Sequence, residues 1–260
     1  MQKSNIEKII GQLLANRGFK NKKEKEIFFN PKNPLEINIE ELEIEKSELK
    51  KSIGRIEKAV KEQELIIVYG DYDVDGICAA AIIWETLDAL GARALPYIPS
   101  RFTEGYGLSK TGIENLLFEN PEVKLIITVD SGIVANEGVD FAKEKNLDVI
   151  ITDHHQKGEG LPKADAIIHT TKLSGSAVAW FLAKALLQKQ KTKNIKQRLL
   201  IDHLGLAALG TISDVLSLTD FNRSIVVYGL RELRNTNRLG LKALCEEAQI
   251  KQEDIDTYHI

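Results

Sequence analysis

The chain has 260 residues, a formal net charge of −3, 43% hydrophobic residues and 28% charged residues, which is typical of a globular protein with one large domain or two small ones. This charge excludes a generally basic nucleic-acid binder or membrane binder, so any anion-binding site must be local. Two cysteines, an N-terminus without the apolar core of a signal peptide, and apolar runs too short to span a bilayer predict a cytoplasmic protein without a membrane partner.

The first 63 residues predict a helical lead-in. Residues 5–19 and 48–63 have helical periodicity and are rich in Lys and Glu, and the turn sequence NPKNP at residues 30–34 separates them. We interpret the charge runs as solvated helix faces.

Strand and helix patterns alternate in the next part of the chain, residues 64–218. Apolar, β-branched segments occur at residues 65–69, 92–99, 124–130, 147–155 and 164–170, and helical patterns occur at 76–91, 109–120, 138–146 and 175–190. This alternation predicts an α/β fold with a doubly wound parallel sheet. The remaining residues, 219–260, form a further segment that is mostly helical by pattern.

Acidic and imidazole side chains follow the predicted strands. Because the carboxyl ends of parallel strands meet at one edge of the sheet, these side chains are expected to share one cleft. A single Asp after a strand is more often a turn or capping residue, but several in one register indicate a site. The residues are Asp71, Asp73, Asp130, Asp153, His154 and His155, together with Asp214 after an apolar helical stretch.

Carboxylates this close together require a cation. The run DYDVDG at residues 71–76 resembles the start of a calcium-binding EF-hand loop, but its twelfth position is Ile82 and a strand precedes it, which excludes that loop. Several carboxylates with one or two histidines favour Mn²⁺, with Mg²⁺ next. So many acidic groups favour two ions that share a bridging aspartate, an arrangement suited to phosphate-ester hydrolysis.

Four motifs carry a resemblance to a known family. The segments GDYDVDG (70–76), VDSGI (129–133), TDHH (152–155) and GTISDV (210–215) resemble motifs I to IV of the DHH phosphoesterase superfamily, in order. The segments IPSRFTEGYGLS (98–109), NTNRLGLKAL (235–244) and LLANRGF (13–19) are similar to its RecJ branch, the single-strand-specific 5′→3′ DNA exonucleases. The resemblance runs from about residue 13 to the end of the chain.

The resemblance implies a role for each matching residue. The metal ligands would be Asp71, Asp73, Asp130, His154 and Asp214, and Asp130 would bridge the two ions and so be catalytic. The second catalytic residue, His155, would face the scissile phosphate or assist the second metal. Asp153 would orient an imidazole without touching metal, and Asp75 would either support the site in the same way or cap the helix that follows it. Many superfamily members carry a histidine four residues before the first motif aspartate. In this chain the residue at that position is Ile67. RecJ-type proteins commonly lack the histidine as well.

Substrate contacts are less specific in the sequence. Arg101 is expected to bind substrate phosphate, or else to pair with Glu104. Phe102 and Tyr106 would stack on bases or be buried as core aromatics. The acid-free, lysine-rich stretch at residues 172–198 would attract a nucleic-acid backbone or be a solvated helix end.

The resemblance therefore implies a metal-dependent 5′→3′ exonuclease that acts on single-stranded DNA in repair and recombination. The alternatives are a DHH phosphodiesterase for short oligoribonucleotides, cyclic dinucleotides or pyrophosphate, and a non-catalytic scaffold with the same fold. RecJ proteins continue into a second, DHHA1-type domain and an oligonucleotide-binding fold. This chain stops before both, and a separate polypeptide is one expected source of the second domain.

Overall fold

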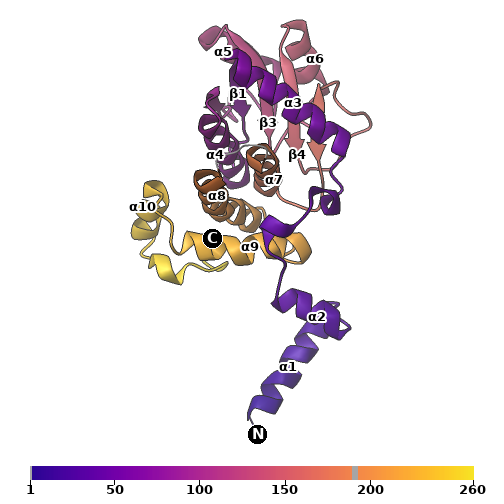
Figure 1. The fold of residues 1–260 in the computed structure, drawn as a ribbon, viewed down its shortest axis with the longest axis vertical. Coiled ribbons are helices and arrows are strands. Elements are labelled where there is room, and N and C mark those ends of the chain that lie inside the picture. The colour runs from indigo at the N-terminus through magenta and orange to yellow at the C-terminus, as the bar shows by residue number, and fades with distance from the viewer. Residues whose placement is uncertain (1, 189–192) are drawn as a thin grey trace.

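A five-stranded parallel sheet lies at the centre of the protein, for which a computed structural model describes residues 2–188 and 193–260. The strand order is β2-β1-β3-β4-β5, and every neighbouring pair is parallel (Figure 1). The doubly wound α/β fold predicted from the sequence is confirmed. The strands are β1 (Leu65–Tyr69), β2 (Arg93–Tyr97), β3 (Val123–Val129), β4 (Asp148–Asp153) and β5 (Ala166–His169).

Helices cover both faces of the sheet. One face packs against α3 (Lys46–Glu62), α4 (Val74–Ala89) and α7 (Gly175–Gln188), and the other packs against α5 (Lys110–Glu119) and α6 (Asn136–Glu144). Strand β1 is buried on both sides because its residues alternate between the two cores. Ile67, at the position where many superfamily members carry a histidine, is 1% exposed and belongs to the core beneath α5 and α6.

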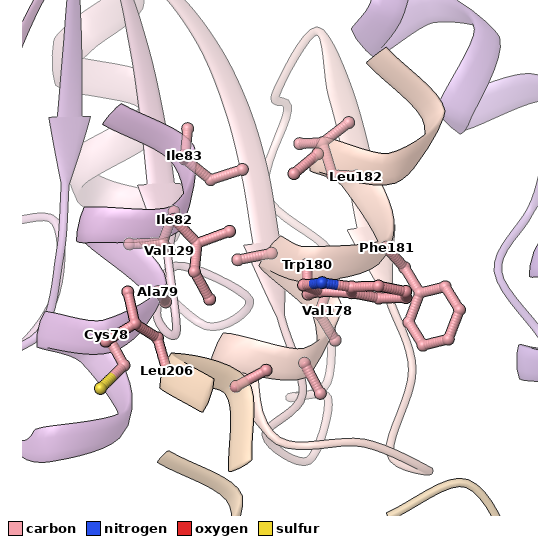
Figure 2. Close-up of a cluster of buried hydrophobic side chains, with 14 of the residues drawn as sticks. Cys78, Ala79, Ile82, Ile83, Val129, Val178, Trp180, Phe181, Leu182 and Leu206 are labelled. Atoms are coloured by element: carbon pink, nitrogen blue, oxygen red, sulfur yellow. The ribbon is translucent and has the colours of Figure 1, made fainter. Parts of the chain in front are cut away.

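The core between α4 and α7 fixes the ends of both helices. Figure 2 shows Ile82 and Ile83 of α4 beside Val129 of β3, with Trp180 and Leu182 of α7 on the other side. The indole Nε1 of Trp180 donates a hydrogen bond to the Leu200 carbonyl at 2.8 Å, which ties α7 to α8 (Lys193–Ser213). Because such interiors are close-packed, the helix termini at the sheet edge are held in place.

The N-terminal part begins with α1 (Gln2–Asn16) and α2 (Lys22–Phe29), which extend away from the sheet (Figure 1). The 3₁₀ turns η1 (Pro34–Glu36) and η2 (Ile39–Leu42) follow. Buried Lys184 of α7 anchors this segment, because its Nζ donates to the Ile37 carbonyl at 2.7 Å and to the Pro34 carbonyl at 3.2 Å.

The C-terminal part contains α9 (Asp220–Leu233), α10 (Leu239–Glu247) and the 3₁₀ turn η3 (Gln252–Asp254). Helix α9 packs closely along α8, since a Cβ atom at Gly229 would lie 2.2 Å from the Leu204 carbonyl oxygen. The domain boundaries after residues 63 and 218 stay predictions. Ile56 of α3 and Ile225 of α9, on either side of them, lie in the same hydrophobic cluster as one face of the sheet.

Three further sequence expectations concern membrane spans, the cysteines and the lysine-rich stretch at residues 172–198. Among the described residues, no helix is both long enough and apolar enough to cross a bilayer. Cys78 and Cys245 are both free thiols. Of the lysine-rich stretch, Lys189 and Lys191 lie outside the described residues.

Candidate metal centre

The candidate site lies where the strand order reverses. β1 and β3 are neighbours in the sheet, while the chain between them runs out to β2 at the edge. In open α/β sheets ligands bind at such a switch point, beside the carboxyl ends of the strands. Asp71 follows β1, Asp130 follows β3 directly, and Asp153 ends β4. The topology therefore brings the predicted residues to one place.

Three overlapping groups of side chains could each hold a metal ion, with the ligand atoms of each group within 4.8 Å of one another. Asp130 and His154 each belong to two of these groups. All five predicted ligands are thus brought together, and a shared Asp130 is what a bridging role requires. The groups are Asp71, Asp73 and Asp130; Asp130, His154 and His155; and Asp75, His154 and Asp214.

The turn from β1 into α4 presents the first two carboxylates. Asp73 is the N-cap of α4, and its Oδ1 accepts a hydrogen bond from the Gly76 amide at 2.9 Å. Buried Asp71 accepts one from the Tyr72 amide at 2.7 Å, and its pKa is raised, chiefly by burial. A Cβ atom at Gly76 would lie 2.7 Å from the Asp71 amide nitrogen, so the tight turn requires a glycine there.

Asp130 occupies a constrained position at the end of β3. Its φ of 57° is left-handed, a conformation that aspartate tolerates better than most residues. The side chain is buried, and its Oδ1 has no hydrogen-bond donor, although His154 Nε2 lies 3.1 Å away. Burial, with further effects from Asp75 and Asp73, raises the Asp130 pKa to about 7 in the metal-free chain. An orphaned, buried carboxylate oxygen among other acidic groups fits a divalent cation.

His154 presents one ring nitrogen to the carboxylates. Its Nε2 lies 3.1 Å from Asp130 Oδ1, 3.6 Å from Asp214 Oδ2 and 3.9 Å from Asp75 Oδ2. Burial opposes protonation of this ring, but Asp130 and Asp75 raise its pKa above the ordinary value. Nε2 is therefore the atom with which His154 would bind a metal. Asp214, which directly follows α8, approaches the same nitrogen. The two residues are far apart in the sequence, so local spacing could not predict this contact.

Asp153 orients the second histidine of the motif. Its Oδ1 accepts hydrogen bonds from the His155 ring Nδ1 at 2.8 Å and from the His154 amide at 2.7 Å, and its Oδ2 accepts from the Ile133 amide at 2.8 Å. Burial alone would raise the Asp153 pKa, but the hydrogen bonds from His155 and from the Ile133 amide lower it. The same pairing raises the His155 pKa to about 9. His155, not His154, is thus the imidazole that Asp153 holds, and the His155 Nε2 is left on the other side of the ring.

Asp75, in the first turn of α4, connects this helix to the start of α7. Its carboxylate accepts hydrogen bonds from the Gly175 amide at 2.6 Å and the Ser176 amide at 3.0 Å, at the N-terminus of α7. The capping of α4, one role expected for Asp75, belongs to Asp73 instead. Asp75 is 2% exposed and joins the beginnings of α4 and α7, with its Oδ2 3.9 Å from His154 Nε2.

Gly175 is a residue that the sequence analysis missed. A Cβ atom there would lie 2.2 Å from Asp130 Oδ1, so only glycine lets the start of α7 approach that carboxylate. Ser174 flanks it and hydrogen-bonds to Thr211 of α8 at 2.9 Å. The Ser-Gly-Ser sequence after β5 was a usable signal, because serine and glycine are common at helix N-termini.

The loop of residues 98–109 lies beside this centre. Arg101 is exposed and stacks over the Tyr72 ring at 5.1 Å. Burial raises the pKa of Asp71, and the charge of Arg101 offsets part of that rise. The alternative pairing with Glu104 does not occur, because the Glu104 carboxylate instead accepts hydrogen bonds from the Tyr97 hydroxyl of β2 and the Ser100 amide of the loop. Phe102 is 96% exposed, so the core position considered for it is wrong.

Comparisons with known proteins show the family to which the chain belongs. The model of the DHH family, N-terminal domain, matches residues 65–211. The chain is 39% identical over 253 residues to the single-stranded-DNA-specific exonuclease RecJ of Bacillus subtilis, covering 92% of this chain and 30% of that protein. It is 36% identical to the Escherichia coli protein of the same name, covering 78% of this chain and 38% of the relative.

Solved structures give the same result. A crystal structure of exonuclease RecJ bound to manganese matches 79% of this chain and 53% of its own, with a TM-score of 0.70 at 32% identity. The Mn²⁺ complex of RecJ from Thermus thermophilus matches 92% of this chain and 33% of its own, with a TM-score of 0.68 at 28% identity. The resemblance predicted from the four motifs is confirmed. This chain spans about a third of the length of the curated relatives.

Proposed function

Because the chain belongs to the DHH family, we propose that it is the catalytic part of a metal-dependent phosphodiesterase that removes nucleotides from the 5′ end of single-stranded DNA. The substrate follows the relatives, which are named single-stranded-DNA-specific exonucleases. DNA repair and recombination in the cytoplasm are part of the proposal.

The observation that carries the proposal is the overlap of the three ligand groups at Asp130 and His154. Carboxylate and imidazole ligands suit Mn²⁺ or Mg²⁺, and solved RecJ structures are named as complexes with each ion. We propose Asp71, Asp73, Asp130, His154 and Asp214 as the ligands of two such ions. When bound, the ions would lower the pKa of a water molecule and stabilise charge on the phosphate.

The protein's own side chains orient the substrate. Asp153 fixes the His155 ring through Nδ1, so that its Nε2 is available to a phosphate oxygen. Arg101, exposed beside Asp71 and Tyr72, would bind a phosphate through its planar guanidinium. Arg101 is exposed, and the His155 side chain is 42% exposed. These features favour catalysis over the scaffold alternative, which would not need the ligands.

The remainder of a RecJ-like protein is proposed to complete DNA binding, in the same chain or as a second polypeptide. The curated relatives are about three times as long as the part that this chain matches. Positioning of a substrate can contribute about 7–11 kcal/mol of barrier reduction in the best model systems. We therefore expect residues 1–260 alone to bind metal but to cut DNA slowly.

The direct test uses single-stranded DNA labelled at the 5′ or the 3′ end, with Mn²⁺ or with a chelator. We expect labelled mononucleotide from the 5′-labelled strand, only with the metal, and faster after addition of the C-terminal part of a RecJ relative. Asp130→Ala should abolish the reaction, and calorimetry should show loss of Mn²⁺ binding. Metal-independent cleavage, release from the 3′ end first, or unchanged Mn²⁺ binding by Asp130→Ala would contradict the proposal.

A further inference from the structure

Val215, which directly follows the proposed metal ligand Asp214, has a left-handed backbone. Its φ is 56°, a region in which a β-branched side chain crowds the backbone and is seldom found. Within residues 2–188 and 193–260 it is the one β-branched residue with a positive φ, since the other non-glycine residues of this kind are aspartate, asparagine, glutamate and glutamine. Strain of this kind persists only where the structure imposes it, and it is concentrated at functional sites.

The turn itself does not require a valine. Backbone hydrogen bonds close it, from the Asp214 amide to the Gly210 carbonyl at 3.0 Å and from the Val215 amide to the Ile212 carbonyl at 3.0 Å. Glycine or asparagine would take the same backbone conformation without crowding. Core packing does not require the valine either, because Val215 is 88% exposed. Its isopropyl group is therefore open to a ligand.

A second exposed valine lies at the same edge of the metal centre. Val74 directly follows the proposed ligand Asp73 in the first turn of α4 and is 43% exposed. Val74 and Ser213, which is two residues before Val215, line one cavity whose other walls are mostly apolar. The start of α4 and the end of α8 thus adjoin, and an apolar side chain follows a proposed ligand on each of them.

An apolar rim beside carboxylates suits one part of a nucleotide. The phosphate would lie at the metal ions, whereas the deoxyribose carbons and the faces of the base are apolar. We propose that Val215, with Val74 on the adjoining helix end, contacts the deoxyribose and base of the nucleotide whose phosphate lies at the metal centre. The inference rests on the proposed function, since it assigns a nucleoside contact in the same site. Covering the exposed isopropyl group removes apolar surface from water and so favours binding.

Val215→Asn separates the side chain from the turn, because asparagine tolerates a left-handed backbone and lacks the branched methyl groups. The Mn²⁺-loaded chains would be titrated with thymidine 5′-monophosphate and with inorganic phosphate. We expect the parent to bind the nucleotide more tightly than phosphate. Val215→Asn should lose about 3- to 10-fold in nucleotide affinity, as expected for one or two buried methyl groups, while phosphate and Mn²⁺ affinities stay unchanged. Its melting temperature should rise by about 2–4 °C as the strain is relieved.

Gln249→Asn is the matched control. Gln249 is exposed and left-handed, with a φ of 55°, but its side chain is not branched at Cβ. It follows α10, outside the proposed metal centre. The same substitution there should leave the melting temperature and the affinities for nucleotide, phosphate and Mn²⁺ unchanged.

Other results would overturn the inference. If the parent binds the nucleotide no more tightly than phosphate, or if Val215→Asn binds it like the parent, the side chain makes no such contact. If Mn²⁺ affinity falls in Val215→Asn, Val215 only supports the turn that carries Asp214. If the melting temperature does not rise, the valine is not strained. If the parent fails to cut DNA even with the C-terminal part of a RecJ relative, but Val215→Asn still loses nucleotide affinity, the contact stands and the proposed exonuclease function fails.

Discussion

Replacing Gly175 with alanine should disturb the metal centre through a single methyl group. The added Cβ would lie 2.2 Å from Asp130 Oδ1 and 2.5 Å from Asp130 Cγ, so one side must move by about 1 Å to reach an ordinary separation. Neither side moves easily. Asp130 is 1% exposed, and the start of α7 is held by two hydrogen bonds to Asp75.

The expected cost follows from these contacts. Overpacking a buried site typically costs about 1–3 kcal/mol, and alanine in place of glycine in a helix returns about 0.5–1 kcal/mol. The net loss of unfolding free energy should therefore lie between about 0 and 2.5 kcal/mol. The larger effect should be on metal binding, since displacement of groups that support ligands commonly lowers metal affinity by about 10- to 100-fold.

Gly54→Ala is the matched control. Gly54 lies within α3, and a Cβ atom there would meet nothing within 4 Å, so this variant should gain about 0.5–1 kcal/mol with unchanged metal binding. Denaturant unfolding of the metal-free proteins and Mn²⁺ calorimetry would measure both effects. If Gly175→Ala gains stability like Gly54→Ala and binds Mn²⁺ like the parent, α7 does not approach Asp130 as described.

Three further predictions address metal, pH and packing. Mn²⁺ should raise the melting temperature of the parent by ligand linkage and chelator should reverse this, with neither effect in Asp130→Ala. In the metal-free chain, the hydrogen bond to Asp153 raises the His155 pKa from 6.5 to about 9. Protonated His155 therefore stabilises the folded state fully below about pH 6.5, and this stabilisation is lost as the pH rises towards 9. Denaturant midpoints should show this loss in the parent and not in His155→Gln. Arg238 bonds to Glu85 at 2.6 and 2.7 Å and to Asp202 at 2.6 Å, so Arg238→Ala should cost about 1.5–3 kcal/mol of unfolding free energy, the typical value of hydrogen bonds to charged groups. Arg93→Ala at an exposed pair should cost under about 0.5 kcal/mol. Equal costs for the two arginines would refute the structural role of the Arg238 network.

The sequence by itself determined the sheet and most of the site. Alternating β-branched and helical segments specify parallel strands with crossover helices, and the polar residues after those strands could only gather at the carboxyl edge. Asp71, Asp130 and His154 could be assigned to one cleft for that reason. The helical pattern expected from residue 109 also matches the structure, where Ser109 caps α5 and its side chain accepts from the Gly112 amide.

Only the tertiary structure decided how the side chains share that cleft. The partner of Asp75 lies a hundred residues away at the start of α7, and the requirement for Gly175 comes from its contact with Asp130. Which histidine Asp153 orients depends on the turn after β4 and on ring geometry, which the motif TDHH does not encode. These contacts are set by the packing of α4, α7 and α8 on one another, and long-range packing leaves no period or spacing in the sequence from which they could be read.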